Sequence, residues 1–141
     1  MIPNSKIRIM VFGTFDILHK GHLDFFKQAR KLSRKPYLIV SVARDTNVKK
    51  IKGRPARFGE KRRLLALKKI RLVDKAVLGA LKNYIKHILA QNPDIIALGY
   101  DQKAYTKDLR ALLAKRGLKV KVARLRPYHP KIYKSSLVKP A

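Results

Sequence analysis

The chain has 141 residues, of which 46% are hydrophobic, so it is long enough for one compact domain with its own core. Thirty-five lysine and arginine residues against eight aspartate and glutamate residues give a formal net charge of +27, which attracts polyanions and speeds encounters with nucleotides. The absence of cysteine excludes disulfides and thiolate metal sites, and no run approaches the roughly 20 apolar residues of a membrane span.

Apolar runs alternate with helical patterns along the chain. Buried strands are expected over residues 7–12, 37–43, 73–78, 95–99 and 120–125. Helical spacing of apolar residues predicts helices that begin near residues 21, 60, 81 and 109. The basic segment 46–60, which contains two glycines and a proline, is expected to be a loop. This alternation predicts an α/β fold, a parallel sheet covered on both faces in a single domain over residues 1–141.

The first strand is followed by the segment GTFDILHKGH, residues 13–22, which places two histidines at the expected start of a helix. A helix N-terminus favours an anion because of its free N–H groups and the positive end of its dipole. His19 and His22, at positions i and i+3, can both donate hydrogen bonds to the oxygens of one phosphoryl group. Gly13 permits a tight turn here, and Gly21 lets a ligand approach the backbone closely. The segment therefore predicts a phosphate site.

The other polar candidates share that position in the expected sheet. In a parallel sheet, ligands bind beyond the carboxyl ends of the strands. Asp45 and a cluster of lysines follow the second strand, Asp101 follows the fourth, and the tail over residues 126–141 follows the fifth. We therefore expect all of them to lie near the two histidines.

The string GTFDxxHxGH resembles the signature of the cytidylyltransferase-like nucleotidyltransferases. These enzymes move a nucleoside monophosphate from CTP or ATP onto an acceptor phosphate and release pyrophosphate. The resemblance extends from the first strand to the serine pair near the end of the chain, and it implies a Rossmann-like, doubly wound, parallel sheet of five strands. It also implies that Mg²⁺ is delivered with the nucleoside triphosphate and that the protein is a homodimer, as its relatives often are.

The resemblance also implies roles for particular residues. His19 and His22 would stabilise the pentavalent transition state, with Lys52 as a further catalytic residue. Lys50 and Arg62, the latter in an ExR-like element, would bind the triphosphate or the acceptor phosphate. The remaining nucleotide-binding candidates are Gly13, Thr14, Phe15, Asp16, Gly21, Gly99, Asp101, Ser135 and Ser136. For each lysine the alternative is an exposed charge without function, and Arg63 is a second arginine near the start of the same helix.

One of these candidates has alternative roles, and two others match the family pattern only in part. Asp16 is expected to orient its loop or to help hold nucleotide-bound magnesium, with capping of the turn by a local hydrogen bond as the alternative. Ser135 and Ser136 match only part of the family's hydroxyl-rich C-terminal element, because Lys134 occupies the first hydroxyl position and the chain ends at Ala141.

Within the family, three segments are most similar to archaeal-type FAD synthetases, which adenylate FMN with ATP. They are ARDTNVKKIKGR at residues 43–54, VDKAVLG at residues 73–79 and PDIIALGYDQ at residues 93–102. Phe15, Tyr100 and Tyr105 are the aromatic residues expected near the flavin, with burial in the core as the alternative for each.

Two alternatives to FMN adenylyl transfer remain open from the sequence. One is CTP:glycerol-3-phosphate cytidylyl transfer, which uses a different triphosphate and a different phosphorylated acceptor. The other is a polyanion-binding or RNA-binding protein with reduced catalysis, which the charge of +27 favours and the complete HKGH string disfavours. The N-terminus lacks the apolar stretch of a secretory signal, so we expect a cytoplasmic protein that does not bind membranes.

Overall fold

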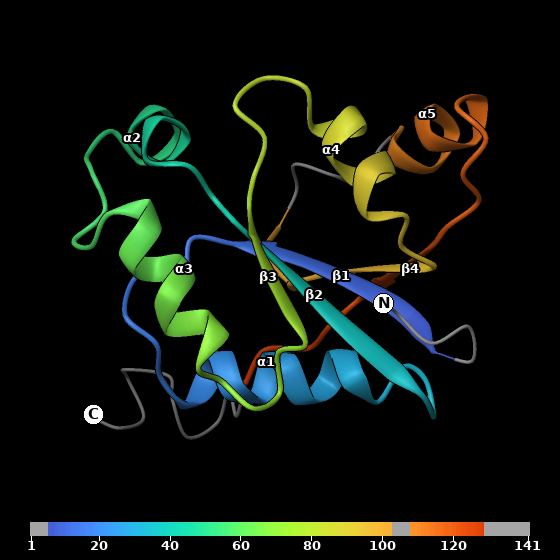
Figure 1. Cartoon of the computed structure of the whole chain (residues 1–141), viewed down its shortest axis with the longest axis horizontal. Coiled ribbons are helices and arrows are strands. Elements are labelled where there is room, and N and C mark those ends of the chain that lie inside the picture. The colour runs from blue at the N-terminus through green and yellow to red at the C-terminus, as the bar shows by residue number, and fades with distance from the viewer. Residues whose placement is uncertain (1–5, 103–107, 129–141) are drawn as a thin grey trace.

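The computed structural model describes residues 6–102 and 108–128. Five strands form one all-parallel sheet in the order β3-β2-β1-β4-β5 (Figure 1). The strands are β1 (Ile7–Gly13), β2 (Pro36–Val42), β3 (Lys75–Leu78), β4 (Ile95–Leu98) and β5 (Lys121–Arg124). The chain builds outwards from β1 to β3 on one side and then returns to place β4 on the other, so the strand order reverses beside β1. That reversal is where ligands bind in open α/β sheets.

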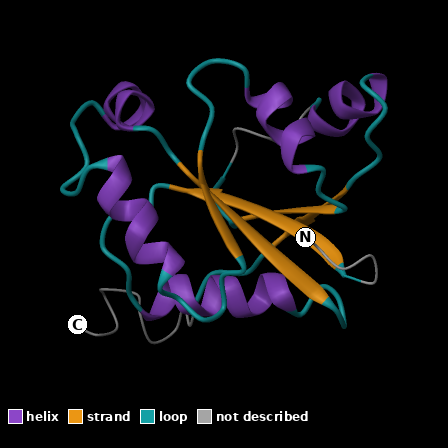
Figure 2. Cartoon of the chain, viewed as in Figure 1, coloured by secondary structure: helices purple, strands orange, loops and turns teal. Residues whose placement is uncertain are grey.

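Helices cover both faces of the sheet, as expected for a doubly wound fold. Figures 1 and 2 show α1 (Lys20–Arg30) and α3 (Glu60–Lys68) on one side of the strands, and α4 (Tyr84–Gln91) and α5 (Leu109–Lys115) on the other. Within the described residues, no helix is long and apolar enough to cross a membrane.

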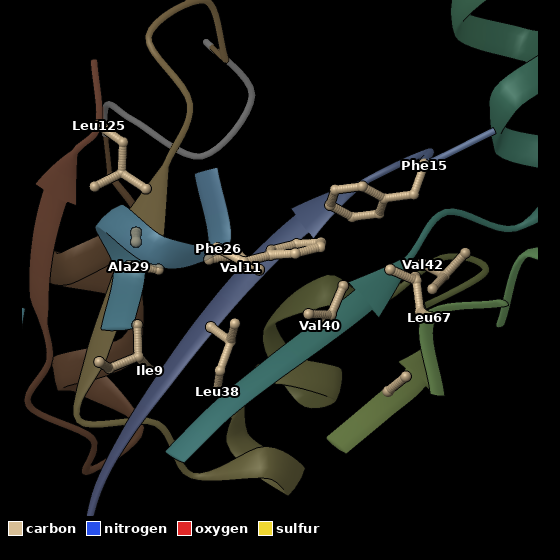
Figure 3. Close-up of a cluster of buried hydrophobic side chains, with 12 residues drawn as sticks. Ile9, Val11, Phe15, Phe26, Ala29, Leu38, Val40, Val42, Leu67 and Leu125 are labelled. Atoms are coloured by element: carbon tan, nitrogen blue, oxygen red, sulfur yellow. The ribbon is translucent and has the colours of Figure 1, made fainter. Parts of the chain in front are cut away.

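The core consists of two layers, one on each face of the sheet, and alternate residues of β1 contribute to each layer. Ile9 and Val11 pack against α1 on one face (Figure 3), whereas Met10 and Phe12 pack under α4 and α5 on the other. Because successive side chains of a strand point to opposite faces, a strand covered on both sides must be apolar throughout. The central position of β1 thus explains its unbroken apolar run.

The expected strands are confirmed with shifts of one or two residues at their ends, but the loop predicted over residues 46–60 is wrong in its first half. Helix α2 spans Asp45–Lys52 and ends at Gly53, which has a left-handed φ of +76°. One apolar residue, Val48, anchors the helix in the core at 2% exposure. A single buried side chain gives the sequence little apolar periodicity, so the helix was not recognised. The frequent lysines suggested a loop, but in the last turn of α2 they stabilise the helix by their interaction with its dipole.

Candidate active site

A cleft of about 1280 Å³ opens at the carboxyl ends of β1 and β4, where the strand order reverses. Its walls include nine of the predicted site residues: Gly13, Thr14, Phe15, His19, Gly21, His22, Lys52, Gly99 and Asp101. Asp16, Lys50 and Arg62 do not line it. Ser135 and Ser136, with Tyr105, lie outside the described residues. The cleft also takes in Lys20 and Gln102, which were not predicted as site residues, and Arg126, which lies at the start of the tail expected there.

The two histidines close the first turn of α1. His19 is the N-cap, and its Nδ1 accepts a hydrogen bond of 3.0 Å from the backbone N–H of Gly21. The Nδ1 of His22 accepts one of 3.2 Å from the backbone N–H of His19, and the ring centroids lie 4.0 Å apart. Since Nδ1 is an acceptor in both rings, each neutral imidazole carries its hydrogen on Nε2. The capping box therefore fixes both tautomers and leaves the Nε2–H groups to donate to an anion in the cleft.

The charged residues around this turn favour the binding of an anionic ligand over the stability of helix α1. An acidic residue in the first turn stabilises a helix through its dipole, yet α1 has none there and begins with Lys20. Lys20, Lys52 and Arg126 all line the cleft, where Asp101 is the one carboxylate among the described lining residues. The helix N-terminus and three cations thus create a positive field that an anionic ligand would relieve.

His22 stays neutral well below physiological pH. Burial lowers the pKa of His22, and repulsion from His19 lowers it further, to about 4. The Phe15 ring supplies part of that apolar cover and meets the His22 ring edge-on, with centroids 5.4 Å apart and planes at 68°. A neutral imidazole donates through Nε2 and cannot bring its own positive charge into a cleft that already holds three cations.

We expect the free energy of unfolding to fall as the pH decreases from 6.5 towards 4. In the unfolded chain His22 takes up a proton near pH 6.5, whereas in the fold it does so only near pH 4. Burial lowers the pKa of His87, and the positive charge of Arg44 lowers it further. His87 therefore adds a second decrease in the free energy of unfolding as the pH falls. Urea unfolding at pH 7 and pH 5 would measure it. The same pH dependence in a His22→Asn/His87→Gln double variant would contradict the assignment.

Both glycines of the motif leave room for a neighbouring ring, a packing role that the sequence did not predict. A Cβ at Gly13 would meet the Phe15 ring at 2.7 Å, and one at Gly21 would meet the His19 ring at 2.8 Å. Neither glycine has a positive φ; Phe15 does, at +52°. Phe15 is 5% exposed and belongs to the core cluster of Figure 3, so it supports the cleft from below. Strained backbone of this kind persists only where the surroundings enforce it.

Asp16 makes neither a local cap nor a wall of the cleft. Its carboxylate accepts hydrogen bonds of 2.7 and 2.9 Å from the backbone N–H groups of Arg57 and Phe58. Loss of hydration alone would raise the pKa of Asp16, but these two bonds, with the charges of Arg63 and Lys52, lower it overall. Asp16 therefore ties the turn after β1 to the loop between α2 and α3.

Replacing Asp16 with alanine should release that loop. The amide hydrogens of Arg57 and Phe58 are expected to exchange roughly tenfold faster, since a hydrogen bond to a charged group contributes about 1.5–3 kcal/mol. Amide exchange followed by NMR would measure this, with Asp101→Ala as the control because Asp101 bonds to neither amide in the structure. Equal exchange rates in the Asp16 variant and the parent would contradict the link.

Helix α3 contains two arginines, and the buried one is Arg63, not Arg62, which matches the ExR-like element. Arg63 is 1% exposed and donates to the carbonyls of Thr14, Ala43 and Phe58 and to the carboxylate of Asp45. Arg62 is exposed and lies 4.4 Å over the Phe58 ring, outside the cleft. Arg63 thus fixes the floor of the site without touching the cleft, and its neighbour covers an aromatic face.

Lys50 and Lys52 point in different directions because both lie on helix α2. Lys52, at the end of α2, lines the main cleft together with Ile51. Lys50 faces a shallow depression of about 450 Å³ beside Asp45 and Pro55 instead. Residues two apart on a helix point in different directions, so a helix cannot present both lysines to one ligand as a loop could.

Gln102 fastens the β4 side of the cleft, a role that the sequence did not predict although the residue ends the segment PDIIALGYDQ. Its Oε1 accepts a 2.7 Å hydrogen bond from the N–H of Gly99, and its Nε2 donates over 2.8 Å to the carbonyl of Phe12. Arg124 of β5 donates to the carbonyls of Gly99 and Gln102 as well. The loop that carries Asp101 is therefore joined to both neighbouring strands.

Comparisons with known proteins show which family the chain matches. The family model described as cytidylyltransferase-like matches residues 10–140. The chain is 44% identical over 122 residues to the FAD synthase of Aciduliprofundum boonei, covering 86% of this chain and 80% of that protein. It is 38% identical over 133 residues to the FAD synthase of Thermoplasma volcanium, covering 94% and 92%.

Solved structures show the same fold. A structure from Thermoplasma volcanium described as a lipopolysaccharide core biosynthesis protein has a TM-score of 0.79 at 39% identity, covering 86% of this chain and 98% of its own. A protein of unknown function from Archaeoglobus fulgidus has a TM-score of 0.64 at 15% identity, which supports the fold alone.

Proposed function

The chain belongs to the cytidylyltransferase-like family, and on that premise we propose that it transfers AMP from ATP to FMN, giving FAD and pyrophosphate. The observation that carries the proposal is the histidine pair at a helix N-terminus in a cationic cleft, where both Nδ1 atoms accept backbone hydrogen bonds and each ring keeps an Nε2–H donor. The choice of FMN and ATP is supported by relatives named FAD synthase that are 36–46% identical over most of the chain.

The reaction needs positioning and charge stabilisation rather than a covalent enzyme intermediate. A phosphate oxygen of FMN attacks the α-phosphorus of ATP and forms a new P–O bond, while the bond from that phosphorus to the β-phosphate bridge breaks and pyrophosphate leaves. Negative charge spreads over the α-phosphate oxygens in between. His19 and His22 donate to those oxygens through Nε2, and Lys20 and Lys52 offset the charge of the triphosphate.

The residues of the cleft fit a magnesium ion that arrives with the triphosphate. Among residues 6–102 and 108–128, no group of three histidine or acidic side chains is placed to hold a metal. Mg²⁺ on a triphosphate needs only one or two protein carboxylates, because phosphates and water complete its shell. Asp101 is the carboxylate that lines the cleft, whereas Asp16 already accepts two backbone hydrogen bonds. The bound ion would neutralise part of the phosphate charge.

The proposal is tested by incubating the purified protein with ATP, FMN and Mg²⁺ and following pyrophosphate release and FAD formation together. Both are expected, and a His22→Asn variant should lose both. Pyrophosphate release with CTP and glycerol 3-phosphate, but not with ATP and FMN, would retain the nucleotidyltransferase site and reject the flavin assignment. No turnover with either pair, from a protein that binds ATP, would reject the proposed activity.

A further inference from the structure

A dense group of cations lies at the opposite end of the sheet from the cleft. The strands are parallel, so the ends of α1 and α3 lie beside the starts of β2 and β3 (Figure 1). Eight exposed basic residues occupy these two junctions: Lys27, Lys31, Arg34, Lys35, Lys68, Lys69, Arg71 and Lys75. We call this set the basic edge. Seven residues of β2 span about 20 Å, which separates the basic edge from the cleft.

One side chain holds the two junctions together. Arg30, at the end of α1, donates to the backbone carbonyl of Leu72 and to the carboxylate of Asp74, in the segment that leads into β3. Asp74 accepts in turn from the backbone N–H of Leu38 in β2. Leu72 and its apolar neighbours pack inwards on the core, so the lysines and arginines between them face solvent. The basic edge is thus one fixed surface rather than two separate loops.

The basic edge has little negative charge to balance it. None of its eight members takes part in an ion pair that the described structure contains; those pairs use Arg30, Arg44 and Arg63. Asp74 is the acidic residue at these junctions, and Arg30 and Leu38 already occupy it. Two helix C-termini each contribute about half a negative charge, far too little to offset eight cations. The basic edge therefore repels itself unless an external anion covers it.

We propose that the basic edge is a second binding surface, which takes the phosphate backbone of double-stranded nucleic acid without reading its sequence. A surface of exposed cations, which form no ion pairs within the described residues, suits the closely spaced phosphates of a duplex. Proteins that hold single strands add exposed aromatic side chains on which bases stack, whereas the aromatic residue at these junctions, Tyr37, is partly buried against the core. An anionic membrane would favour exposed apolar side chains, and at these junctions only Leu32, 37% exposed, stands out among the large ones.

Two variants with the same net charge separate the basic edge from the overall charge. One carries Lys31→Gln, Lys35→Gln, Lys69→Gln and Lys75→Gln. The control carries Lys82→Gln, Lys86→Gln, Lys115→Gln and Lys119→Gln, four exposed lysines on or beside α4 and α5. Binding to a fluorescent duplex DNA of about 20 base pairs is measured by anisotropy between about 50 and 200 mM salt. The edge variant is expected to bind at least tenfold more weakly at the higher salt, and its salt slope should fall by about 0.9 for each phosphate that it no longer neutralises.

The control variant should bind within about twofold of the parent. Both variants should keep the parent's rate of FAD formation, and saturating ATP should not displace the duplex, because the basic edge lies away from the cleft. Equal losses in the two variants would show that the net charge alone attracts DNA and would overturn the proposal. Displacement by ATP, or tighter binding to the single strand than to the duplex, would overturn it too.

Discussion

A His19→Asn variant is expected to turn over about 10²- to 10³-fold more slowly than the parent, with almost no change in melting temperature. His19 has two tasks on two different atoms. Its Nδ1 caps α1 by accepting from Gly21, and its Nε2–H is left for the ligand. The side-chain oxygen of asparagine is itself a good N-cap, so it keeps the first task and loses the second. Turnover and thermal unfolding of the variant would measure the two effects separately.

His19→Ala is the matched control, because it removes both atoms. It should lose turnover to the same degree and should also lose about 1 kcal/mol of stability with the cap. Full turnover in the asparagine variant would contradict a role for Nε2. Full stability in the alanine variant would contradict the cap.

The parts of this molecule that the sequence predicted are those with a local and periodic cause. The run Ile7–Phe12 is apolar because β1 is covered on both faces, and that pattern can be recognised without coordinates. The position of the histidine pair follows as well, since a strand and a helix that flank it determine where it lies. The family resemblance added the chemistry, and its fold is confirmed.

The contacts that the sequence did not predict join residues that lie far apart in the chain. Asp16 bonds to amides 41 and 42 positions later, and Gln102 bonds to a carbonyl 90 positions earlier. No window of neighbouring residues contains such a pair. The burial of Arg63 rather than Arg62 could not be predicted for the same reason, because the two arginines differ only in the direction that each takes from α3. Direction depends on the register of the helix against the sheet, which only the packed structure shows.

Arg63→Met should lower the free energy of unfolding by about 3–5 kcal/mol, because it removes a buried donor shared by four acceptors, and each buried acceptor left unsatisfied costs about 1–3 kcal/mol. The guanidinium joins four segments through bonds of 2.7 to 3.0 Å: the turn after β1, the end of β2, the start of α2 and the loop before α3. Methionine fills a similar volume but leaves the carbonyls of Thr14 and Ala43 without this donor. Urea unfolding would measure the loss, and Arg62→Met, at an exposed position, should lose less than about 1 kcal/mol.

Arg63→Lys distinguishes the effect of geometry from the effect of charge, and it is the variant to use should Arg63→Met fail to fold. An ammonium group keeps the charge but cannot reach carbonyls on three segments with the planar fork of a guanidinium. Its stability should therefore fall between that of Arg63→Met and the parent. Loss of the Arg63 hydrogen bond should also raise the pKa of Asp45, which the fold lowers although burial opposes it. A lysine variant as stable as the parent would show that a positive charge alone stabilises these segments. The planar geometry of the guanidinium would then not explain the arginine at this position of α3.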